Sequence, residues 1–397
     1  TTTTITVTAD AKTKTYGDTD PELTYTVSPA SASNALTGDL SREQGTDVGS
    51  YAITQGSLTA GGNYTITFVS KNLTITPKAI TVTADAKSKM FGAQDPELTY
   101  TVSPDLVAGD TFSGALSREQ GEDVGTYAIN QHTLTAGGNY TITYVGSNLI
   151  ITPATITVTA DAKTKTYGDT DPELTYTVSP ASAGSALTGD LSREQGTDVG
   201  RYIITQGSLT ADNNYELKYV GSQLTITPKH ITVTADAKTK SYGDKDPDLT
   251  YTVSPALVAG DSFSGALSRE QGEEAGTYVI NQHTLTAGDN YTLTYVGSNL
   301  TITPKTITVT AEAKTKTYGD KDPALTYSFS PSLVAGDSFS GGLSRQPGEN
   351  AGKYSINQGS LALSNNYAIT YNANQLTINK AVLTATAGDK TICFGEQ

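Results

Sequence analysis

Acidic residues spaced two apart are the first residues in this sequence whose types fit a chemical role. Asp18-Thr19-Asp20 has the spacing with which a calcium-binding loop begins. Calcium takes roughly six to eight oxygen ligands, and no dense Asp/Asn/Gly loop is present to supply them. Local turn chemistry explains the pair better, with calcium as the alternative, and no other cofactor is predicted. The pair recurs at Asp169/Asp171, Asp244/Asp246 and Asp320/Asp322, whereas the second copy reads Ala93-Gln94-Asp95.

Histidine and cysteine offer little further chemistry. The three histidines are His132, His230 and His283, and the single cysteine is Cys393. None of these histidines has the spacing of a metal-binding motif or of a nucleophile and its base. We therefore expect solvated surface histidines, with no catalytic residue, no metal site and no enzymatic activity.

The elements that carry these residues are copies of one another. Ile5-Thr6-Val7-Thr8-Ala9 returns about every 75 residues, starting at Ile80, Ile156, Ile231, Ile307 and, in looser form, Leu383. A period of that length is too long for a solenoid repeat and fits a small domain. The sequence therefore predicts five repeats, residues 1–78, 79–154, 155–229, 230–305 and 306–381, and the start of a truncated sixth at 382–397.

The overall charge excludes two classes of partner. The formal net charge is −14. Binding to nucleic acid needs clustered Lys and Arg to neutralise phosphates, and anionic membranes attract basic segments in the same way. No stretch approaches the roughly 18 apolar residues that a membrane-spanning helix requires. We expect no nucleic-acid partner and no membrane insertion by this segment.

Each repeat has the pattern of short strands. Apolar and polar residues alternate in Ile5-Thr6-Val7-Thr8 and in Leu23-Thr24-Tyr25-Thr26-Val27, while Gly61-Gly62-Asn63 is turn chemistry. No helical period is present, so the predicted fold class is all-β, a tandem array of small immunoglobulin-like β-sandwiches. A β-grasp-like unit is the alternative, because Asp20-Pro21-Glu22 is able to start a helical turn.

Comparison of the copies picks out columns that recur. Gly at the Gly17 position indicates a positive φ, and aromatic residues at the Tyr51 and Tyr64 positions indicate core packing. Asp20 and Arg42 recur together, so we expect them to pair within each repeat or to cap a turn. The recurring structural residues of the first copy are Gly17, Asp20, Arg42, Tyr51, Asn63, Tyr64 and Pro77.

The links between repeats are short. Pro77 lies between the last strand of one copy and the first strand of the next, with equivalents at Pro153, Pro228 and Pro304. Proline fixes φ and restricts the preceding residue, and no Gly/Ser-rich linker is present. We therefore expect an extended rod of about 150–200 Å, at roughly 30 Å or a little more per repeat.

One loop differs between copies. The first and third copies carry Ala-Ser-Ala, whereas others carry an apolar loop that is a candidate contact surface to a partner or to the next repeat. A loop folded over its own core is the other interpretation. The residues of the candidate contact loop are Leu106, Val107 and Phe112 in the second copy and Leu257, Val258 and Phe263 in the fourth.

The recurring motifs resemble a known family. Tyr-Gly-Asp-x-Asp-Pro at Tyr16–Pro21 is followed by Leu-Ser-Arg at Leu40–Arg42, Val-Gly-x-Tyr-x-Ile at Val48–Ile53 and Leu-Thr-Ile-Thr-Pro at Leu73–Pro77. Together they resemble the "mostly beta, glycine-rich" (MBG-type) tandem repeat of large bacterial surface proteins. The resemblance implies an extracellular or bacterial cell-surface location, an adhesin-like protein and no enzymatic activity.

These observations favour a structural stalk that projects a distal binding domain. Two alternatives stay open. One is a filament or surface-layer subunit that self-associates end to end by strand addition. The other is an adhesive array whose weak contacts to a host or cell-surface ligand add up.

Overall fold

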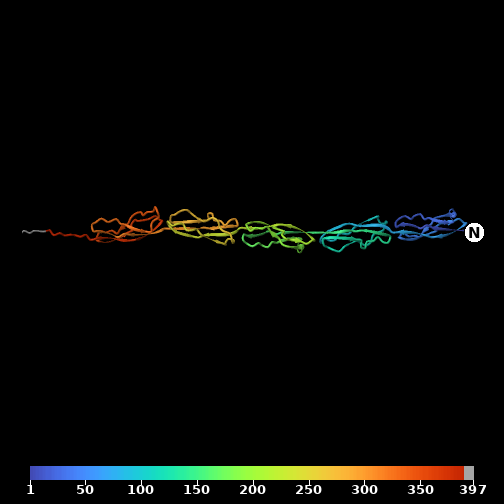
Figure 1. Cartoon of the computed structure of the whole chain (residues 1–397), viewed down its shortest axis with the longest axis horizontal. Coiled ribbons are helices and arrows are strands. Elements are labelled where there is room, and N and C mark those ends of the chain that lie inside the picture. Colours follow the sequence, from blue (N-terminus) through green and yellow to red (C-terminus); the bar gives the residue numbers. More distant parts are fainter. Residues whose placement is uncertain (389–397) are drawn as a thin grey trace, which may run out of the picture. The chain divides into compact units, whose positions relative to one another are not determined.

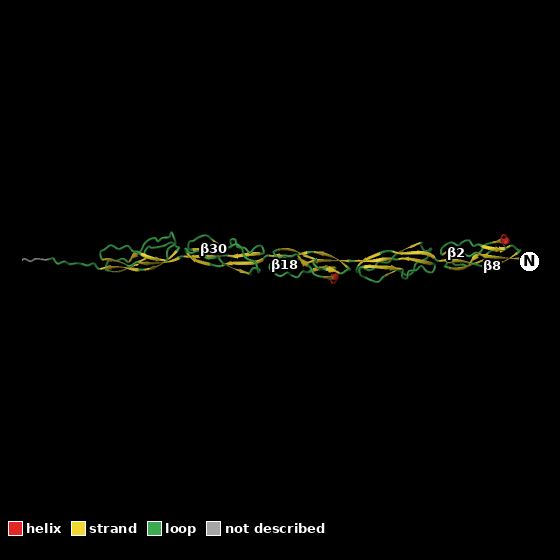
Figure 2. Cartoon of the chain, in the orientation of Figure 1, coloured by secondary structure: helices red, strands yellow, loops and turns green. Residues whose placement is uncertain are grey.

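The structure is a computed structural model that describes residues 1–388, so Cys393 lies outside the described residues. In Figure 1 each repeat takes up one stretch of the colour scale, so its sheets are built from neighbouring parts of the sequence. Figure 2 shows that strands and loops make up nearly all of the described chain, with helix confined to two short turns. No helix of the described residues is long and apolar enough to cross a membrane.

The strands recur in the same order in every repeat. In the first repeat the elements are β1 (Thr3–Ala9), β2 (Lys12–Thr15), β3 (Tyr25–Ser28), η1 (Ala30–Ala35), β4 (Leu36–Thr37), β5 (Ser41–Arg42), β6 (Gly49–Thr54), β7 (Thr59–Ala60), β8 (Tyr64–Val69) and β9 (Asn72–Thr76). In the second they are β10 (Lys78–Ala84), β11 (Lys87–Met90), β12 (Tyr100–Ser103), β13 (Ser117–Arg118), β14 (Gly125–Asn130), β15 (Tyr140–Val145) and β16 (Ser147–Thr152).

The remaining three repeats follow the same scheme. In the third the elements are β17 (Ala154–Ala160), β18 (Lys163–Thr166), β19 (Tyr176–Ser179), η2 (Ala181–Ala186), β20 (Leu187–Thr188), β21 (Ser192–Arg193), β22 (Gly200–Thr205), β23 (Thr210–Ala211), β24 (Tyr215–Val220) and β25 (Ser222–Thr227). In the fourth they are β26 (Lys229–Ala235), β27 (Lys238–Ser241), β28 (Tyr251–Ser254), β29 (Ser268–Arg269), β30 (Gly276–Asn281), β31 (Tyr291–Val296) and β32 (Ser298–Thr303). In the fifth they are β33 (Lys305–Ala311), β34 (Lys314–Thr317), β35 (Tyr327–Ser330), β36 (Ser344–Arg345), β37 (Gly352–Asn357), β38 (Tyr367–Asn372) and β39 (Asn374–Asn379).

The fourth repeat shows how one unit is built. A three-stranded sheet has the order β28-β26-β31, and a four-stranded sheet has the order β27-β32-β30-β29. The opening strand β26 runs antiparallel to β28 but parallel to β31. The chain then crosses to the second sheet, where β27 runs parallel to β32. The first strand of the repeat therefore pairs with the last strand but one, and the second strand pairs with the last.

The alternation of Thr with apolar residues places one face of each opening strand in the core. In β26, Ile231, Val233 and Ala235 are at most 5% exposed, while the side chains between them face outward. The same core cluster takes Ile280 from β30 and Leu300 from β32, so both sheets contribute to it. Because two sheets enclose one core, the unit is a small β-sandwich, and the predicted all-β tandem array is confirmed. The described residues contain no α-helix, so the helix of a β-grasp unit is absent from them.

Contacts divide the described chain into two compact units, and the division runs through the third repeat. Unit 1 comprises Thr1–Asp161, Leu174–Glu194 and Ile203–Gln223, and unit 2 comprises Ala162–Glu173, Gln195–Tyr202 and the residues from Leu224 onward. Repeats 1 and 2 therefore lie within unit 1, and repeats 4 and 5 lie within unit 2.

Two loop classes distinguish the repeats after the third strand. Repeats 1 and 3 have the 3₁₀ turns η1 and η2 there, a form we call the 3₁₀ loop. Repeats 2, 4 and 5 have instead a turn with the sequence Leu-Val-Ala-Gly-Asp, a form we call the Asp loop, at residues 106–110, 257–261 and 333–337.

Candidate functional site: the charged network and the joints between repeats

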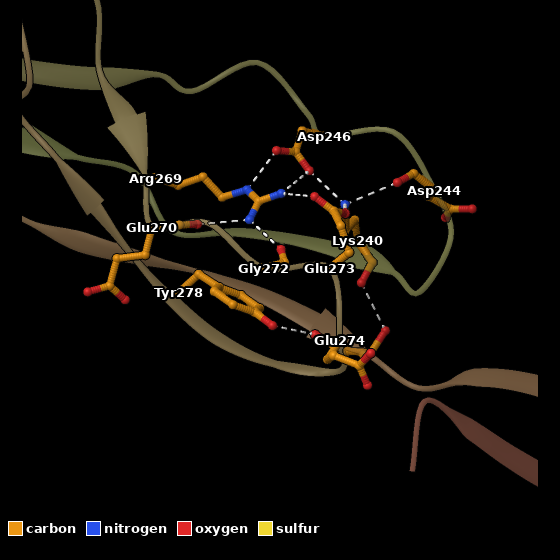
Figure 3. A network of polar contacts seen from close by, with 10 residues as sticks. Lys240, Asp244, Asp246, Arg269, Glu270, Gly272, Glu273, Glu274 and Tyr278 are labelled. Carbon is orange, nitrogen blue, oxygen red and sulfur yellow. Dashed lines mark hydrogen bonds and ion pairs between the residues drawn. The ribbon is translucent and has the colours of Figure 1, made fainter. Parts of the chain in front are cut away.

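A buried lysine, Lys89, Lys240 or Lys316, organises a charged network in repeats 2, 4 and 5. In repeat 4, Lys240 lies on the less exposed face of β27 and is only 8% exposed. Its Nζ lies 2.6 Å from Asp246 and 2.7 Å from Glu273. Figure 3 shows these three side chains converging with Arg269. A buried charge is costly unless it is paired and hydrogen-bonded, and here the pairing is complete.

Arg269 ties the same carboxylates to the neighbouring strand. Its Nε donates to Asp246 at 2.7 Å, and its terminal nitrogens bond to Asp246, Glu273 and the backbone oxygen of Gly272. The guanidinium group also lies over the ring of Tyr278, 5.4 Å from its centroid. The network thus joins β27, the turn that contains Asp246, and the loop between β29 and β30.

The Asp and Arg that recur in the sequence pair with each other, as repeats 1, 2, 4 and 5 show. Asp20 and Arg42 are 2.7 Å apart, and Lys14 is 2.8 Å from the same carboxylate. The equivalent pairs are Arg118–Asp95, Arg269–Asp246 and Arg345–Asp322. Hydrogen bonds from Arg42 and then Lys14 lower the pKa of Asp20 to about 2, and Arg118 and Lys89 lower the pKa of Asp95 to about 2.

Tyr51 lies beneath the arginine of its own repeat. Arg42 is 5.5 Å from the centroid of its ring, and its hydroxyl donates to the backbone oxygen of Asp47 at 2.8 Å. Gly45 faces the ring so closely that an added Cβ would lie 2.0 Å from Tyr51 Cε1. Sequence reasoning missed Gly45, although Gly recurs at the same place in every copy.

In the joint between repeats 1 and 2, which lies within unit 1, two tyrosines form hydrogen bonds with the same aspartate. Tyr16 of repeat 1 and Tyr140 of repeat 2 both donate to Asp110 Oδ2 in the Asp loop of repeat 2, Tyr16 at 3.0 Å. Their rings meet edge to face with centroids 5.5 Å apart. The hydrogen bond with Asp110 and then burial raise the pKa of Tyr16.

A second contact of this joint comes from the Gly-Gly-Asn turn. Asn139 of repeat 2 accepts a hydrogen bond from the Val48 backbone amide at 2.8 Å, and its Nδ2 donates to Asp47 at 2.9 Å. The same contact recurs from Asn214 to Val124 within unit 1, and from Asn290 to Val199 and Asn366 to Ala275 within unit 2. Asn366 is only 4% exposed.

The covalent link at each joint is a single proline. Pro77 alone separates β9 from β10, so a strand of one repeat leads directly into the opening strand of the next. That strand begins at Lys78, one residue before the boundary predicted from the sequence.

Comparison with known families identifies the repeat. The model of the MBG domain (YGX type) matches five times, at residues 5–74, 80–150, 156–225, 231–301 and 307–377. This chain belongs to the MBG domain family. The predicted resemblance is therefore confirmed.

Other comparisons add little to the family assignment. No curated protein matches the chain. Among solved structures, Drosophila N-cadherin EC1-4 shares 8% sequence identity, over 65% of this chain and 83% of that one, with a TM-score of 0.18. That score is too low to carry an argument about either fold or function.

The candidate contact loop of the MBG repeats packs in two directions. Leu106, Val107 and Phe112 all lie against the core of their own repeat, where Phe112 meets Tyr100 edge to face. Val107 also faces the preceding repeat, because an added Cβ on Gly17 would lie 2.5 Å from Val107 Cγ2. Gly17 has a φ of +86°, so both its backbone and this close approach explain the recurring glycine.

A valine likewise fills the space over the glycine of the preceding repeat, here called the notch, at two further joints within unit 2. An added Cβ on Gly168 would lie 2.4 Å from Val258, and one on Gly243 would lie 2.4 Å from Val334. Leu257 and Phe263 belong to the loop that carries Val258, and Phe263 packs on Tyr251 of the same repeat. The loop therefore contacts the preceding repeat rather than the next one.

The joint between MBG repeats 2 and 3 is built differently. Phe91 takes the place of tyrosine, and its ring meets Tyr215 edge to face at 5.3 Å. Repeat 3 carries the 3₁₀ loop η2, which has no aspartate. No atom lies within 4 Å of a Cβ added to Gly92, so the notch is open there.

Asn63 and Tyr64 of the first MBG repeat hold local positions. The backbone oxygen of Asn63 accepts a hydrogen bond from the Thr3 amide at 2.9 Å. Tyr64 opens β8 and is half-buried. Their counterparts Asn139 and Tyr140 make the joint contacts described above.

The structure shows the local surroundings of the acidic pairs and of the histidines in the MBG repeats. Asp20 forms ion pairs with Arg42 and Lys14. The described residues hold no group of three or more His, Cys, Asp or Glu arranged to bind a metal. His132 and His283 have φ values of 48° and 51° at a turn position that is glycine in other copies. His230 lies 2.9 Å from the Thr294 hydroxyl.

Proposed function

We propose that this chain is a non-catalytic spacer of a bacterial cell-surface, adhesin-like protein, holding a distal binding domain away from the cell. Tandem repetition of one small domain supports a role in reach and number rather than in a single pocket. The single observation that carries the proposal is the joint itself, where a lone proline and side-chain contacts such as Asn139 to Val48 link one repeat to the next. Contacts of this kind limit bending at the joint, and a spacer needs this stiffness.

The strand pairing within each repeat supports the same role under tension. In repeat 2, the opening strand β10 pairs in parallel with β15 over six residues, and β11 pairs in parallel with β16 over four. A pull on the two ends of the repeat drags these parallel strands past each other. All hydrogen bonds of both ladders then resist the load together instead of opening one by one.

The tyrosines argue against an adhesive stripe along the repeats. Tyr318 is the one exposed tyrosine among the described residues, and the others are at least half-buried. Exposed aromatic side chains are what a surface for weak, repeated ligand contacts would offer. The spacer therefore has the better support of the two.

Single-molecule stretching of the whole chain tests this proposal. We expect five separate unfolding events, each releasing about 200–250 Å of chain for a repeat of this length. Extension without discrete events would contradict a load-bearing spacer. Binding of the chain alone to cells or glycans, growing with repeat number, would favour the adhesive array instead.

A further inference from the structure

The residue at the Tyr16 position of one repeat matches the loop class of the repeat that follows. Tyr16, Tyr167 and Tyr242 each donate to the aspartate of a following Asp loop, namely Asp110, Asp261 and Asp337. Phe91, which has no hydroxyl, precedes the 3₁₀ loop, which has no carboxylate. Hydroxyl and carboxylate are thus present together or absent together at all four joints.

The chemistry of the joint explains this matching. A tyrosine hydroxyl that becomes enclosed needs an acceptor, and an enclosed carboxylate needs donors, so either group alone is costly. The valine of the Asp loop adds a shape match, because it fills the notch over the glycine after the tyrosine. A 3₁₀ loop supplies neither the carboxylate nor the valine.

In repeat 5, no Asp loop of the described residues covers the equivalent face, which is formed by Tyr318 and Gly319. Tyr318 is 53% exposed, whereas its counterpart Tyr167 is 9% exposed. No atom lies within 4 Å of a Cβ added to Gly319, so the notch that Val334 fills over Gly243 is empty over Gly319. A shallow pocket there is lined by Tyr318, Ala351 and the apolar side chain of Leu383 among others.

We propose that this face of repeat 5 is a docking surface for one kind of partner, an MBG repeat of the Asp-loop class. The partner's aspartate accepts from the Tyr318 hydroxyl, its valine fills the notch over Gly319, and its asparagine at the Asn366 position accepts from the Ala351 amide. Each of these contacts is present at the equivalent joint between repeats 4 and 5. Whether the residue at the Tyr318 position is tyrosine or phenylalanine therefore determines which class of repeat forms a stable neighbour.

A second copy of this chain is a poor occupant of the face. Its first repeat carries the 3₁₀ loop η1, so it has no aspartate for Tyr318 and no valine for the notch. The matching rule therefore disfavours end-to-end association of identical chains through this face.

Extension of the natural chain by one further repeat tests the proposal. One extended chain carries a copy of repeat 4, residues 229–304, after Lys380, and the other carries a copy of repeat 3, residues 154–228. Each is made with Tyr318 and with Tyr318→Phe. Hydrogen exchange of the Ala351 amide reports how often the new joint opens, and exchange of the buried Ile356 amide in β37 controls for the fold of repeat 5.

The four chains have distinct expected results. With Tyr318 present, the Asp-loop extension slows Ala351 exchange roughly tenfold more than the 3₁₀-loop extension does. Tyr318→Phe removes most of that difference and leaves Ile356 unchanged. Equal effects of Tyr318→Phe in both extended chains would overturn the matching rule, as would equal protection of Ala351 by the two repeat classes. Fibres of the natural chain that are lost on Tyr318→Phe would show that a second copy is the occupant instead.

Discussion

The side-chain oxygen of Asn139 accepts a hydrogen bond from the backbone amide of Val48, although the two residues belong to different repeats. The donor amide lies just before β6, and the acceptor sits in the turn before β15. One side chain thus connects two domains that are joined covalently through a single proline. This contact is the element of the joint that recurs unchanged at all four joints.

Asn139→Ala should loosen the joint between repeats 1 and 2 without unfolding either. The substitution removes the acceptor for the Val48 amide and the donor to Asp47, and a lost hydrogen bond of this kind costs about 1 kcal/mol. We expect Val48 to exchange its amide hydrogen several-fold faster in hydrogen-exchange measurements. Asn63→Ala is the matched control, since it alters the same turn in repeat 1, where the described residues include no preceding repeat for Asn63 to contact. Equal effects of both variants at Val48 would contradict the role given to Asn139.

Tyr16→Phe should weaken the same joint through the Asp110 carboxylate. Asp110 keeps Tyr140 as a donor, so we expect a loss of about 1 kcal/mol rather than of a whole paired charge. Phe91→Tyr is the reciprocal change, and it adds a hydroxyl opposite a loop without a carboxylate. It should give no gain in stability. Thermal unfolding of both variants beside the natural chain checks this, and stabilisation by Phe91→Tyr would count against hydroxyl–carboxylate matching.

The charged network sets the behaviour of the repeats in acid. Arg118 and Lys89 lower the pKa of Asp95 from 3.8 to about 2. A lowered pKa in the folded state means that the carboxylate stabilises the fold above about pH 4, and that this contribution disappears as the pH falls towards about 2. NMR titration of the Asp95 carboxyl carbon measures the value directly.

Arg118→Gln provides the control for the acid titration. It removes the first cause of the shift, so the pKa of Asp95 should rise towards 3.8 and acid unfolding should begin at a higher pH. An unchanged Asp95 titration in this variant would show that the ion pair is absent in solution.

Gly45→Ala should strongly destabilise repeat 1. The new methyl group would lie 2.0 Å from the Tyr51 ring carbon Cε1, and relieving such overpacking costs about 1–3 kcal/mol. Gly61→Ala is the matched control, because nothing lies within 4 Å of its added Cβ. Calorimetry should show a lower unfolding temperature for one repeat in the first variant only. Similar transitions for both variants would refute the close packing of Gly45 on Tyr51.

The regular features of the repeat could be predicted from the sequence because they leave a periodic signal. Alternation of Ile5 and Val7 with threonine marks a half-buried strand, and the structure buries both residues. Asp20 and Arg42 could be suspected as partners because they recur together, and side-chain geometry then brings them within 2.7 Å.

The joints were harder to predict, because their residues also have ordinary local explanations. Gly-Gly-Asn at Asn139 has the composition of a turn, and nothing local says that its side chain reaches another repeat. Lys240 was part of an alternating strand with no sign of its burial against two acids. One signal was present but unused, since the change from tyrosine to Phe91 coincides with the change of loop class in the next repeat.

Small-angle scattering of the purified chain in solution tests the spacer most directly. Five repeats in line, at the length of about 150–200 Å expected from their strands, give a radius of gyration of roughly 45–60 Å. A compact globular protein of this chain length would give about 21 Å. We predict the larger value, independent of protein concentration and unchanged by salt. A value near the compact limit would contradict the account, because the repeats would then fold back on one another instead of holding their ends apart.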